Sequence, residues 1–495
     1  MKLKIRKFNW LAGRPVVLLN PKTASKLNVR PDERVSLNGR KIYAVVDIFN
    51  NLISNEEIGI SEELSVLLHK KNEDLIEVYP AALHKAGVLI SNKLEGKELS
   101  KEEIKEIISE IVQNNLTESE IAYFLSAEKL IGMSFNEIVF LIQAMVESGK
   151  KLDFGNKIVA DKHCIGGIAG NRTTPIVVSI CASAGLLIPK TSSRAITSAS
   201  GTADVVETIA KVEFSAEELK KIVEKTGACL VWGGSLGLAP SDDKIIHVER
   251  IINIDVESQL LASIMSKKIS VGSNHILIDI PYGKETKVKN IQQAKRLGEK
   301  FRKIAKFFKL KLKTVYTNGE DPIGNGIGPV LEMLDVISVL KNEANCSEKL
   351  KEKSLFLASQ LLELCGHKNS MKEAEEILFS GKAYQKFKEI INIQNGKEKN
   401  SNDFEARISK LKTANLNRGI FAEKSGNIEN IDNKMINNLA RILGTPDNKS
   451  AGIFIHKNSG VVKKGEKILT LYTESQAKLN EASSIIKEKK PIEIK

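Results

Sequence analysis

Aromatic residues are scarce in this chain of 495 residues, at 5% of its composition. The formal charge is +13, yet no repeat of basic and aromatic residues suggests base stacking. The lysines are spread along the chain and often mixed with glutamate, as in SKEEIKEIISE, which indicates solvated helix faces. Nucleic-acid binding is therefore not favoured as the main role, because a small anionic substrate explains the charge as well.

Paired cysteines and long apolar runs are also missing. The cysteines are scattered and form no C-x-x-C pair, and no histidine cluster accompanies them, so neither a disulfide framework nor a metal site is expected. They are Cys164, Cys181, Cys229, Cys346 and Cys365. The most apolar run, Thr174 to Pro189, is shorter than the roughly 20 residues that span a bilayer. The N-terminus has no signal-peptide pattern, and we expect a cytoplasmic protein that contacts no membrane.

The length predicts about three domains, and the pattern along the chain indicates four segments. Residues 1–84 are expected to form a β-rich, barrel-like domain with a role in packing or assembly. The runs VVLLN, RVSLNG and KIYAVVDIFN alternate there with turn signals. Residues 85–152 read as a helical domain, which a piece at about 239–270 is expected to join.

Capping boxes mark three successive helix starts in the second segment. Ser100 with Glu103, Thr117 with Glu120, and Ser134 with Glu137 each precede an apolar run at helical spacing.

The third segment, 153–238 with about 271–412, alternates strand-like and helical runs, which predicts an α/β domain with a mainly parallel sheet. The fourth, 413–495, has the pattern of an α+β, hammerhead-like fold. It lacks a Met-Lys-Met-like turn, so we expect no attached prosthetic group. The fold class is thus a multidomain α/β protein.

Two strand–loop–helix units follow one another in the third segment. KIVADKH is expected to end a strand, CIGGIAGN to form a loop, and RTTPIVVSICASAG to form a helix. LLIPKTSS, RAITSASGTAD and VVETIAKV repeat the pattern. Loops of this kind at the carboxyl ends of adjacent parallel strands, before helix N-termini, bind anions. We predict a phosphate site there, with two ordinary loops as the alternative.

These residues carry a resemblance. DKHCIGGIAGNRTTP followed by KTSSRAITSASGTADVVE resembles the thymidine phosphorylase superfamily, and the similarity extends through IDVESQLLASIMSKK and DPIGNGIGPVLEM over roughly residues 85–495. SRAITS with GTAD and Cys164 looks like the AMP phosphorylase branch, which carries an extra N-terminal domain. The resemblance implies that AMP and phosphate give adenine and ribose 1,5-bisphosphate, with CMP and UMP as further substrates and with no cofactor. It also implies a homo-oligomer.

The resemblance also assigns roles by position. The residues expected to hold phosphate are Lys162, Thr174, Ser192 and Thr202. Those expected to contact AMP are Gly167, Ser193, Arg194, Ala195, Ile196, Thr197, Ser198, Thr202, Ser263 and Lys287. Asp255 matches the catalytic proton donor to the base, a role that requires a pKa raised by burial or a nearby anion. A helix N-cap is the alternative for Asp255.

Other residues of these motifs have open roles. Arg194 is a candidate for a bidentate clamp on phosphate. His163 suits either proton transfer or a structural hydrogen bond, and Cys164 is not expected to act as a nucleophile because no activating partner is evident. Lys267 and Lys268 match a base-contacting lysine of pyrimidine members, with a solvated helix end as the alternative.

Two other functions compete with AMP phosphorolysis. One is a pyrimidine nucleoside phosphorylase of the thymidine type, without a preference for the 5′-phosphate. The other is a non-enzymatic nucleic-acid-binding protein, against which the intact loops with Lys162 and Arg194 argue.

Overall fold

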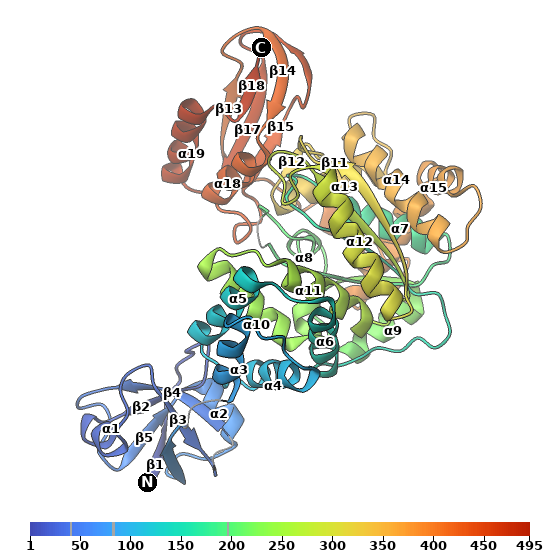
Figure 1. Cartoon of the computed structure of the whole chain (residues 1–495). Coiled ribbons are helices and arrows are strands. Elements are labelled where there is room, and N and C mark those ends of the chain that lie inside the picture. The colour runs from blue at the N-terminus through green and yellow to red at the C-terminus, as the bar shows by residue number, and fades with distance from the viewer. Residues whose placement is uncertain (40–41, 82–84, 196–197) are drawn as a thin grey trace. The chain divides into compact units, whose positions relative to one another are not determined.

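A computed structural model of the chain describes residues 1–39, 42–81, 85–195 and 198–495 (Figure 1). The chain divides into two compact units. Unit 1 comprises Met1–Ser148 and Pro240–Ala262, and unit 2 comprises Gly149–Ala239 and Ser263–Lys495. Within the described ranges, no helix is long and apolar enough to cross a membrane.

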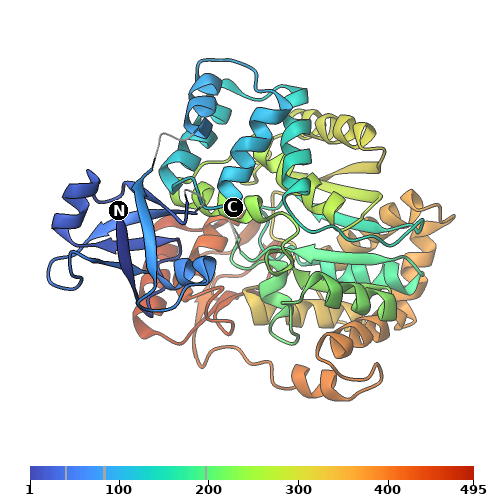
Figure 2. The same ribbon diagram turned by 90° about the horizontal axis from the view of Figure 1, so that it is seen from below.

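Unit 1 begins with a closed β-barrel. Its strands are β1 (Lys2–Lys7), β2 (Val16–Leu19), β3 (Arg34–Leu37), β4 (Ile42–Ile48), β5 (Glu57–Ile60) and β6 (Leu75–Pro80), and α1 (Pro21–Leu27) and α2 (Glu62–Leu68) lie between them. The strand order is β1-β5-β2-β4-β3-β6. The barrel is drawn in blue in Figure 2. Apolar side chains such as Leu3 and Ile5 alternate with charged ones along β1 and fill the interior. The strands expected from the sequence are β2, β3 and β4; the structure adds β1, β5 and β6.

Helices make up the rest of unit 1. They are α3 (Lys85–Leu94), α4 (Lys101–Val112), α5 (Glu118–Ile131), α6 (Phe135–Glu147), α10 (Pro240–Ile252) and the start of α11 (Glu257–Ser270). The three predicted capping boxes are confirmed at the starts of α4, α5 and α6. Helix α10 packs against α4 and α5, so residues 240–262 of the expected piece join the earlier helices, whereas Ser263–Ser270 belong to unit 2.

Unit 2 contains the parallel strands that were expected. They are β7 (Ala160–Cys164), β8 (Ile188–Ser192), β9 (Ala228–Trp232), β10 (His275–Tyr282) and β11 (Lys311–Asn318). One sheet has the order β11-β10-β7 and another pairs β8 with β9, all in parallel. A parallel bridge between Val159 and Leu187 joins the starts of β7 and β8. The mixed α/β class is therefore confirmed.

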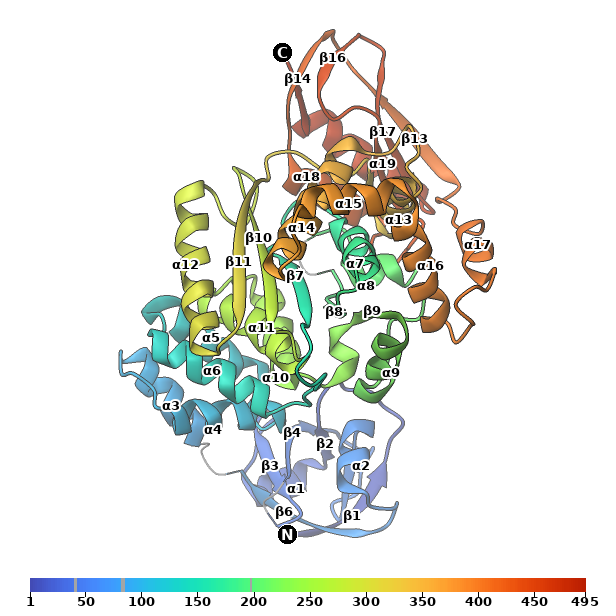
Figure 3. The ribbon, with the colours of Figure 1, turned by 90° about the vertical axis from the view of Figure 1, so that its right-hand side faces the viewer.

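Helices cover both faces of these strands. In Figure 3, α12 (Ile291–Phe307) lies on one side of the β11-β10-β7 sheet and α14 (Glu348–Leu364) on the other, and both pack on β10. The other helices of this region are α7 (Thr173–Ser183), α8 (Thr202–Val206), α9 (Ala216–Thr226), η1 (Gly233–Leu236), α13 (Pro329–Leu340), α15 (Ser370–Phe379), α16 (Lys382–Gln394) and α17 (Asp403–Ile408).

Strand β7 lies later in the chain than its apolar flank suggests. KIVADKH was expected to end the strand, but β7 begins only at Ala160 and continues to Cys164, the first residue of the expected loop. Asp161 and Lys162 within it are both buried. Charged residues are tolerated in the interior where opposite charges pair. Asp161 forms ion pairs with Lys268 at 2.7 Å and with Lys190 at 3.4 Å.

The end of the chain forms two further sheets, in the orders β12-β15-β17-β13 and β16-β14-β18. Their strands are β12 (Gly326–Ile327), β13 (Leu416–Phe421), β14 (Gly426–Ile431), β15 (Gly452–Ile455), β16 (Gly460–Val462), β17 (Lys467–Thr473) and β18 (Ile492–Ile494), accompanied by α18 (Asn433–Leu443) and α19 (Gln476–Lys489). Strand β12 comes from the earlier α/β segment and pairs with β15, which ties the C-terminal sheets to it.

Candidate active site

The residues expected to hold phosphate stand on two neighbouring strands and at the starts of the helices that follow them. Lys162 lies on β7 and Ser192 ends β8. Thr174 is the second residue of α7, and Thr202 is the first residue of α8. Helix N-termini leave backbone N–H groups unpaired, which favours an anion beside them.

Lys162 is a buried cation that forms no ion pair of its own with a carboxylate of the described residues. Its side chain is 1% exposed, and its Nζ donates to Thr173 Oγ1 at 2.8 Å. The carboxylate of Asp279 instead pairs with Lys353 at 3.2 Å and accepts from Thr317 at 2.7 Å. Burial lowers the pKa of Lys162 below its ordinary value. An anion beside Lys162 would oppose this effect, because its charge favours the ammonium form.

The buried hydroxyl of Ser192 also lacks a partner. Its Oγ makes no hydrogen bond to any described residue, and neither does the buried Oδ1 of Asn171 in the first loop. Buried polar atoms are nearly always hydrogen-bonded in folded proteins, so each of these two unsatisfied atoms suits a polar ligand.

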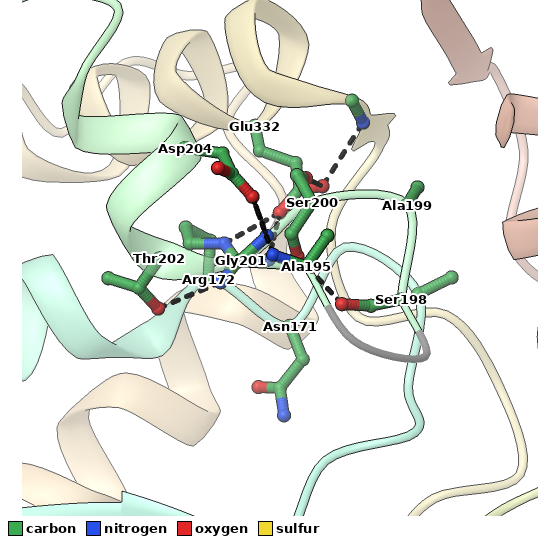
Figure 4. A network of polar contacts seen from close by, with 12 residues as sticks. Asn171, Arg172, Ala195, Ser198, Ala199, Ser200, Gly201, Thr202, Asp204 and Glu332 are labelled. Atoms are coloured by element: carbon green, nitrogen blue, oxygen red, sulfur yellow. Dashed lines mark hydrogen bonds and ion pairs between the residues drawn. The ribbon is translucent and has the colours of Figure 1, made fainter. Parts of the chain in front are cut away.

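A buried network joins the two predicted loops (Figure 4). Arg172, which ends the first loop, donates from Nε to Glu332 Oε2 at 2.6 Å and from NH1 to Thr202 Oγ1 at 2.8 Å. Its NH2 donates to the carbonyl oxygen of Ser200 at 2.9 Å. Glu332 also accepts from the Ser200 hydroxyl and from Gly328 N. Arg172 and Glu332 therefore fix Thr202 relative to the first loop.

Glu332 had no predicted role. It lies in DPIGNGIGPVLEM, which supported the resemblance, but it stands 160 residues after Arg172 and no local spacing links the two.

Arg194 is engaged by carboxylates in this structure, which argues against its predicted use as a phosphate clamp. Its guanidinium donates to Glu207 at 2.8 and 2.9 Å, to Glu213 at 3.0 Å and to Asp204 at 3.2 Å. It also lies over the Trp232 ring at 4.8 Å. Hydrogen bonding by Arg194 is the largest cause that lowers the pKa of Glu207, to about 2. These carboxylates already neutralise the positive charge of Arg194, which a bound phosphate would need for itself.

The second loop closes on the start of α8. Asp204 Oδ2 accepts from the backbone N–H groups of Ala195 at 2.7 Å and Gly201 at 2.8 Å. Ser198 Oγ donates to the carbonyl oxygen of Ser200 at 2.7 Å, and the Ser193 carbonyl accepts from Ala203. Ile196 and Thr197, expected to contact AMP, lie outside the described residues.

The first loop approaches Lys287, another expected AMP contact. Gly167 has φ +97°, and a Cβ added there would lie 3.3 Å from Lys287 N, so glycine permits this approach. Ser263 lies on α11, where its carbonyl oxygen accepts from Ser266 Oγ at 3.3 Å.

Asp255, the expected acid, lies in unit 1 between α10 and α11, and its carbonyl oxygen accepts from Lys129 Nζ at 2.7 Å. Its side chain is exposed, so burial, one of the two conditions named for the acid role, is not found here.

A solvated helix end was the alternative for Lys267 and Lys268, which lie near His163. Lys268 is 2% exposed and bonded to Asp161, so that alternative is wrong for Lys268. Burial lowers the pKa of Lys268 to about 7. Burial, followed by the charge of Lys268, holds the pKa of His163 well below its ordinary value, which leaves a neutral imidazole.

Burial raises the pKa of the Cys164 thiol, so a thiolate nucleophile at this position is not favoured. In the described ranges, no cluster of three or more His, Cys, Asp or Glu residues is placed to hold a metal ion.

The sequence of the whole chain is similar to known protein families and to known proteins. Residues 88–149 match the model of the helical bundle domain of a glycosyl transferase family, and residues 156–384 match its a/b domain. The AMP phosphorylase of Methanococcoides burtonii is 39% identical, with 99% of this chain and 97% of that protein covered. The AMP phosphorylase of Thermococcus kodakarensis is 41% identical, with 100% and 98% covered.

One solved structure is similar to this chain in its fold alone. Anthranilate phosphoribosyltransferase from Thermus thermophilus aligns with a TM-score of 0.52 at 16% identity, over 62% of this chain and 99% of that chain. The near full-length relatives, together with the match to the a/b domain, show that the chain belongs to the AMP phosphorylase family.

Proposed function

We propose that the chain cleaves AMP with inorganic phosphate, giving adenine and ribose 1,5-bisphosphate. A phosphate oxygen forms a bond to the anomeric carbon of the ribose, and the bond from that carbon to the base breaks. The base nitrogen takes up a proton, and the 5′-phosphate stays on the sugar. Family membership supports this reaction class.

The observation that carries the proposal is the unpaired state of two phosphate-site groups. Among the described residues, the Lys162 ammonium has only a hydroxyl partner and the Ser192 hydroxyl has none. A phosphate oxygen would accept from both, which would relieve the cost of burying them. Thr174 and Thr202, at the starts of α7 and α8, would add further donors.

Holding two anions together is the main task that this reaction sets. The attacking phosphate and the 5′-phosphate repel each other, so cations and hydroxyl donors must bring them into position before the bond forms. We assign the attacking phosphate to Lys162 and Ser192, and the nucleotide to the second loop with Gly167, Ser263 and Lys287. We assign proton donation to Asp255, which would require a less exposed setting with AMP bound.

Further properties complete the proposal. CMP and UMP are additional substrates, and no cofactor takes part. The protein is a cytoplasmic homo-oligomer, and the two C-terminal sheets form a hammerhead-like structural region without an attached group.

A substrate panel tests the proposal. The protein is incubated with AMP, CMP, UMP, adenosine or thymidine, with and without phosphate, and free base is measured. We expect base release from monophosphates only when phosphate is present. Release from nucleosides but not from monophosphates would support the thymidine-type alternative, and release without phosphate would indicate a hydrolase.

A further inference from the structure

We propose that helix α18 positions both loops of the anion site, and that Asn437 on this helix fixes the second loop for AMP binding. The inference rests on the proposed function, because it concerns the AMP affinity of the same site. It gives the C-terminal region a part in substrate binding.

A row of polar side chains on α18 bonds to the loops. Asn433 Oδ1 accepts from the backbone N–H of Ala169 in the first loop at 3.0 Å. Asn437 Oδ1 accepts from the N–H of Ala199 in the second loop at 3.0 Å. Residues four apart share one face of a helix, so one helix turn holds one backbone group of each loop.

The next residue of this row repeats the contact. Arg441, four residues after Asn437, donates from Nε to the carbonyl oxygen of Ser198 at 3.3 Å. The second loop is therefore held at two successive residues: Ser198, which ends the stretch 193–198 expected to contact AMP, and Ala199 directly after it.

The loops are also packed into the C-terminal core. Ala169 and Ala199 are each 1% exposed and belong to the same apolar cluster as Ile436 and Leu439 of α18. In each loop, the alanine methyl group thus packs into this core, and the backbone N–H of the same alanine donates to an asparagine of α18. Without Asn437, the buried N–H of Ala199 would lose its partner.

The asparagine amides are themselves anchored. Asn437 Nδ2 donates to the carbonyl oxygen of Asn433 at 2.9 Å. Asn433 Nδ2 donates to the carbonyl oxygens of Gly319 at 3.1 Å and Glu320 at 2.7 Å. Because both side chains are buried and held from two sides, they present their oxygens to the loops in fixed positions. A loop ordered before AMP arrives loses less entropy on binding.

Steady-state kinetics of an Asn437→Ala variant test the inference. We expect KM for AMP to rise about tenfold, as for the loss of one buried hydrogen bond, with KM for phosphate changed less than about threefold and kcat within about twofold. Asn438→Ala is the matched control, because Asn438 is the exposed neighbour on the same helix, and it should behave as wild type.

Hydrogen exchange of the Ala199 amide provides a readout that does not depend on activity. It should exchange faster in Asn437→Ala than in wild type or Asn438→Ala. Arg441→Met, at an exposed position, is a second test if Asn437→Ala does not fold, and it should also raise KM for AMP.

An unchanged KM for AMP in folded Asn437→Ala, or an equal rise in both KM values, would overturn the inference. If wild type itself fails to cleave AMP with phosphate, the proposed function fails instead, and the exchange result still decides whether Asn437 holds the loop.

Discussion

The Nζ of Lys162 lies 2.8 Å from Oγ1 of Thr173, the first residue of α7, and this hydroxyl is the partner of a lysine that is 1% exposed. A buried ammonium held by a neutral group at a helix N-terminus is poorly compensated. Such an arrangement suits an anion-binding site. We therefore expect the loss of Lys162 to lower activity with phosphate more than the loss of any other residue of the site.

Replacing Lys162 by methionine removes the charge but keeps a side chain of similar length. We expect kcat/KM for phosphate to fall roughly 100- to 1,000-fold, as when a preorganised donor to a reacting anion is removed. Stability should not fall, because the variant no longer buries a poorly compensated charge. Kinetics and urea denaturation measure the two effects. Lys157→Met, at an exposed position just before β7, is the control, and equal losses in both variants would refute the assignment.

Ser192→Ala tests the unsatisfied hydroxyl. Hydrogen bonds to charged groups contribute about 1.5–3 kcal/mol, so phosphate affinity should fall roughly 10- to 100-fold. Because Ser192 Oγ has no described partner in the free protein, the melting temperature should stay within a few degrees of wild type. Phosphate titration by calorimetry, with Ser179→Ala on α7 as the control, gives the answer. Wild-type phosphate affinity in Ser192→Ala would show that the hydroxyl is not a ligand.

A buried carboxyl in unit 1 predicts a pH dependence of stability. Glu128 accepts from Ser258 Oγ at 2.5 Å and from Gln259 Nε2 at 2.7 Å, beside the segment that carries Asp255. Burial raises the pKa of Glu128 from 4.5 to about 7, against the hydrogen bonds and the charge of Lys93. Between about pH 4.5 and pH 7, Glu128 is therefore protonated to a greater extent in the folded state than in the unfolded state.

The sign follows from that difference. The free energy of unfolding contributed by Glu128 is largest below about pH 4.5 and falls as pH rises to about 7, by on the order of 3 kcal/mol. In Glu128→Gln, this part of the pH dependence should disappear, whereas exposed Glu95→Gln should keep it. Urea denaturation across pH 4.5–7.5 provides the comparison. Parallel curves for wild type and Glu128→Gln would contradict the raised pKa.

Asp255→Asn tests the proposed acid. Loss of a general acid lowers kcat by roughly 100- to 10,000-fold, while AMP binding should be affected much less. Glu257→Gln, two residues later and exposed, is the control and should keep most of the activity. Near-normal turnover of AMP by Asp255→Asn would exclude Asp255 as the proton donor.

Local signals in the sequence predicted local structure well. The helix starts at Ser100, Thr117 and Ser134 followed from their capping boxes, because the bonds join residues three apart. Strand β1 was missed because only two apolar residues, Leu3 and Ile5, alternate with its lysines and arginine, so the signal is short.

The interior polar groups could not be predicted in the same way. Asp161 is buried in a strand because Lys190 and Lys268 approach it from distant parts of the chain. A polar helix face ordinarily indicates solvent, so Asn433 and Asn437 gave no sign that their face of α18 meets two loops.

Isotope transfer tests the central claim most directly. The protein is given AMP and phosphate labelled with ¹⁸O at every oxygen, and the sugar product is analysed by mass spectrometry. If phosphate attacks the anomeric carbon, the product is ribose 1,5-bisphosphate whose new phosphate group retains all of the label. Unlabelled ribose 5-phosphate, formed at the same rate with or without phosphate, would contradict the account.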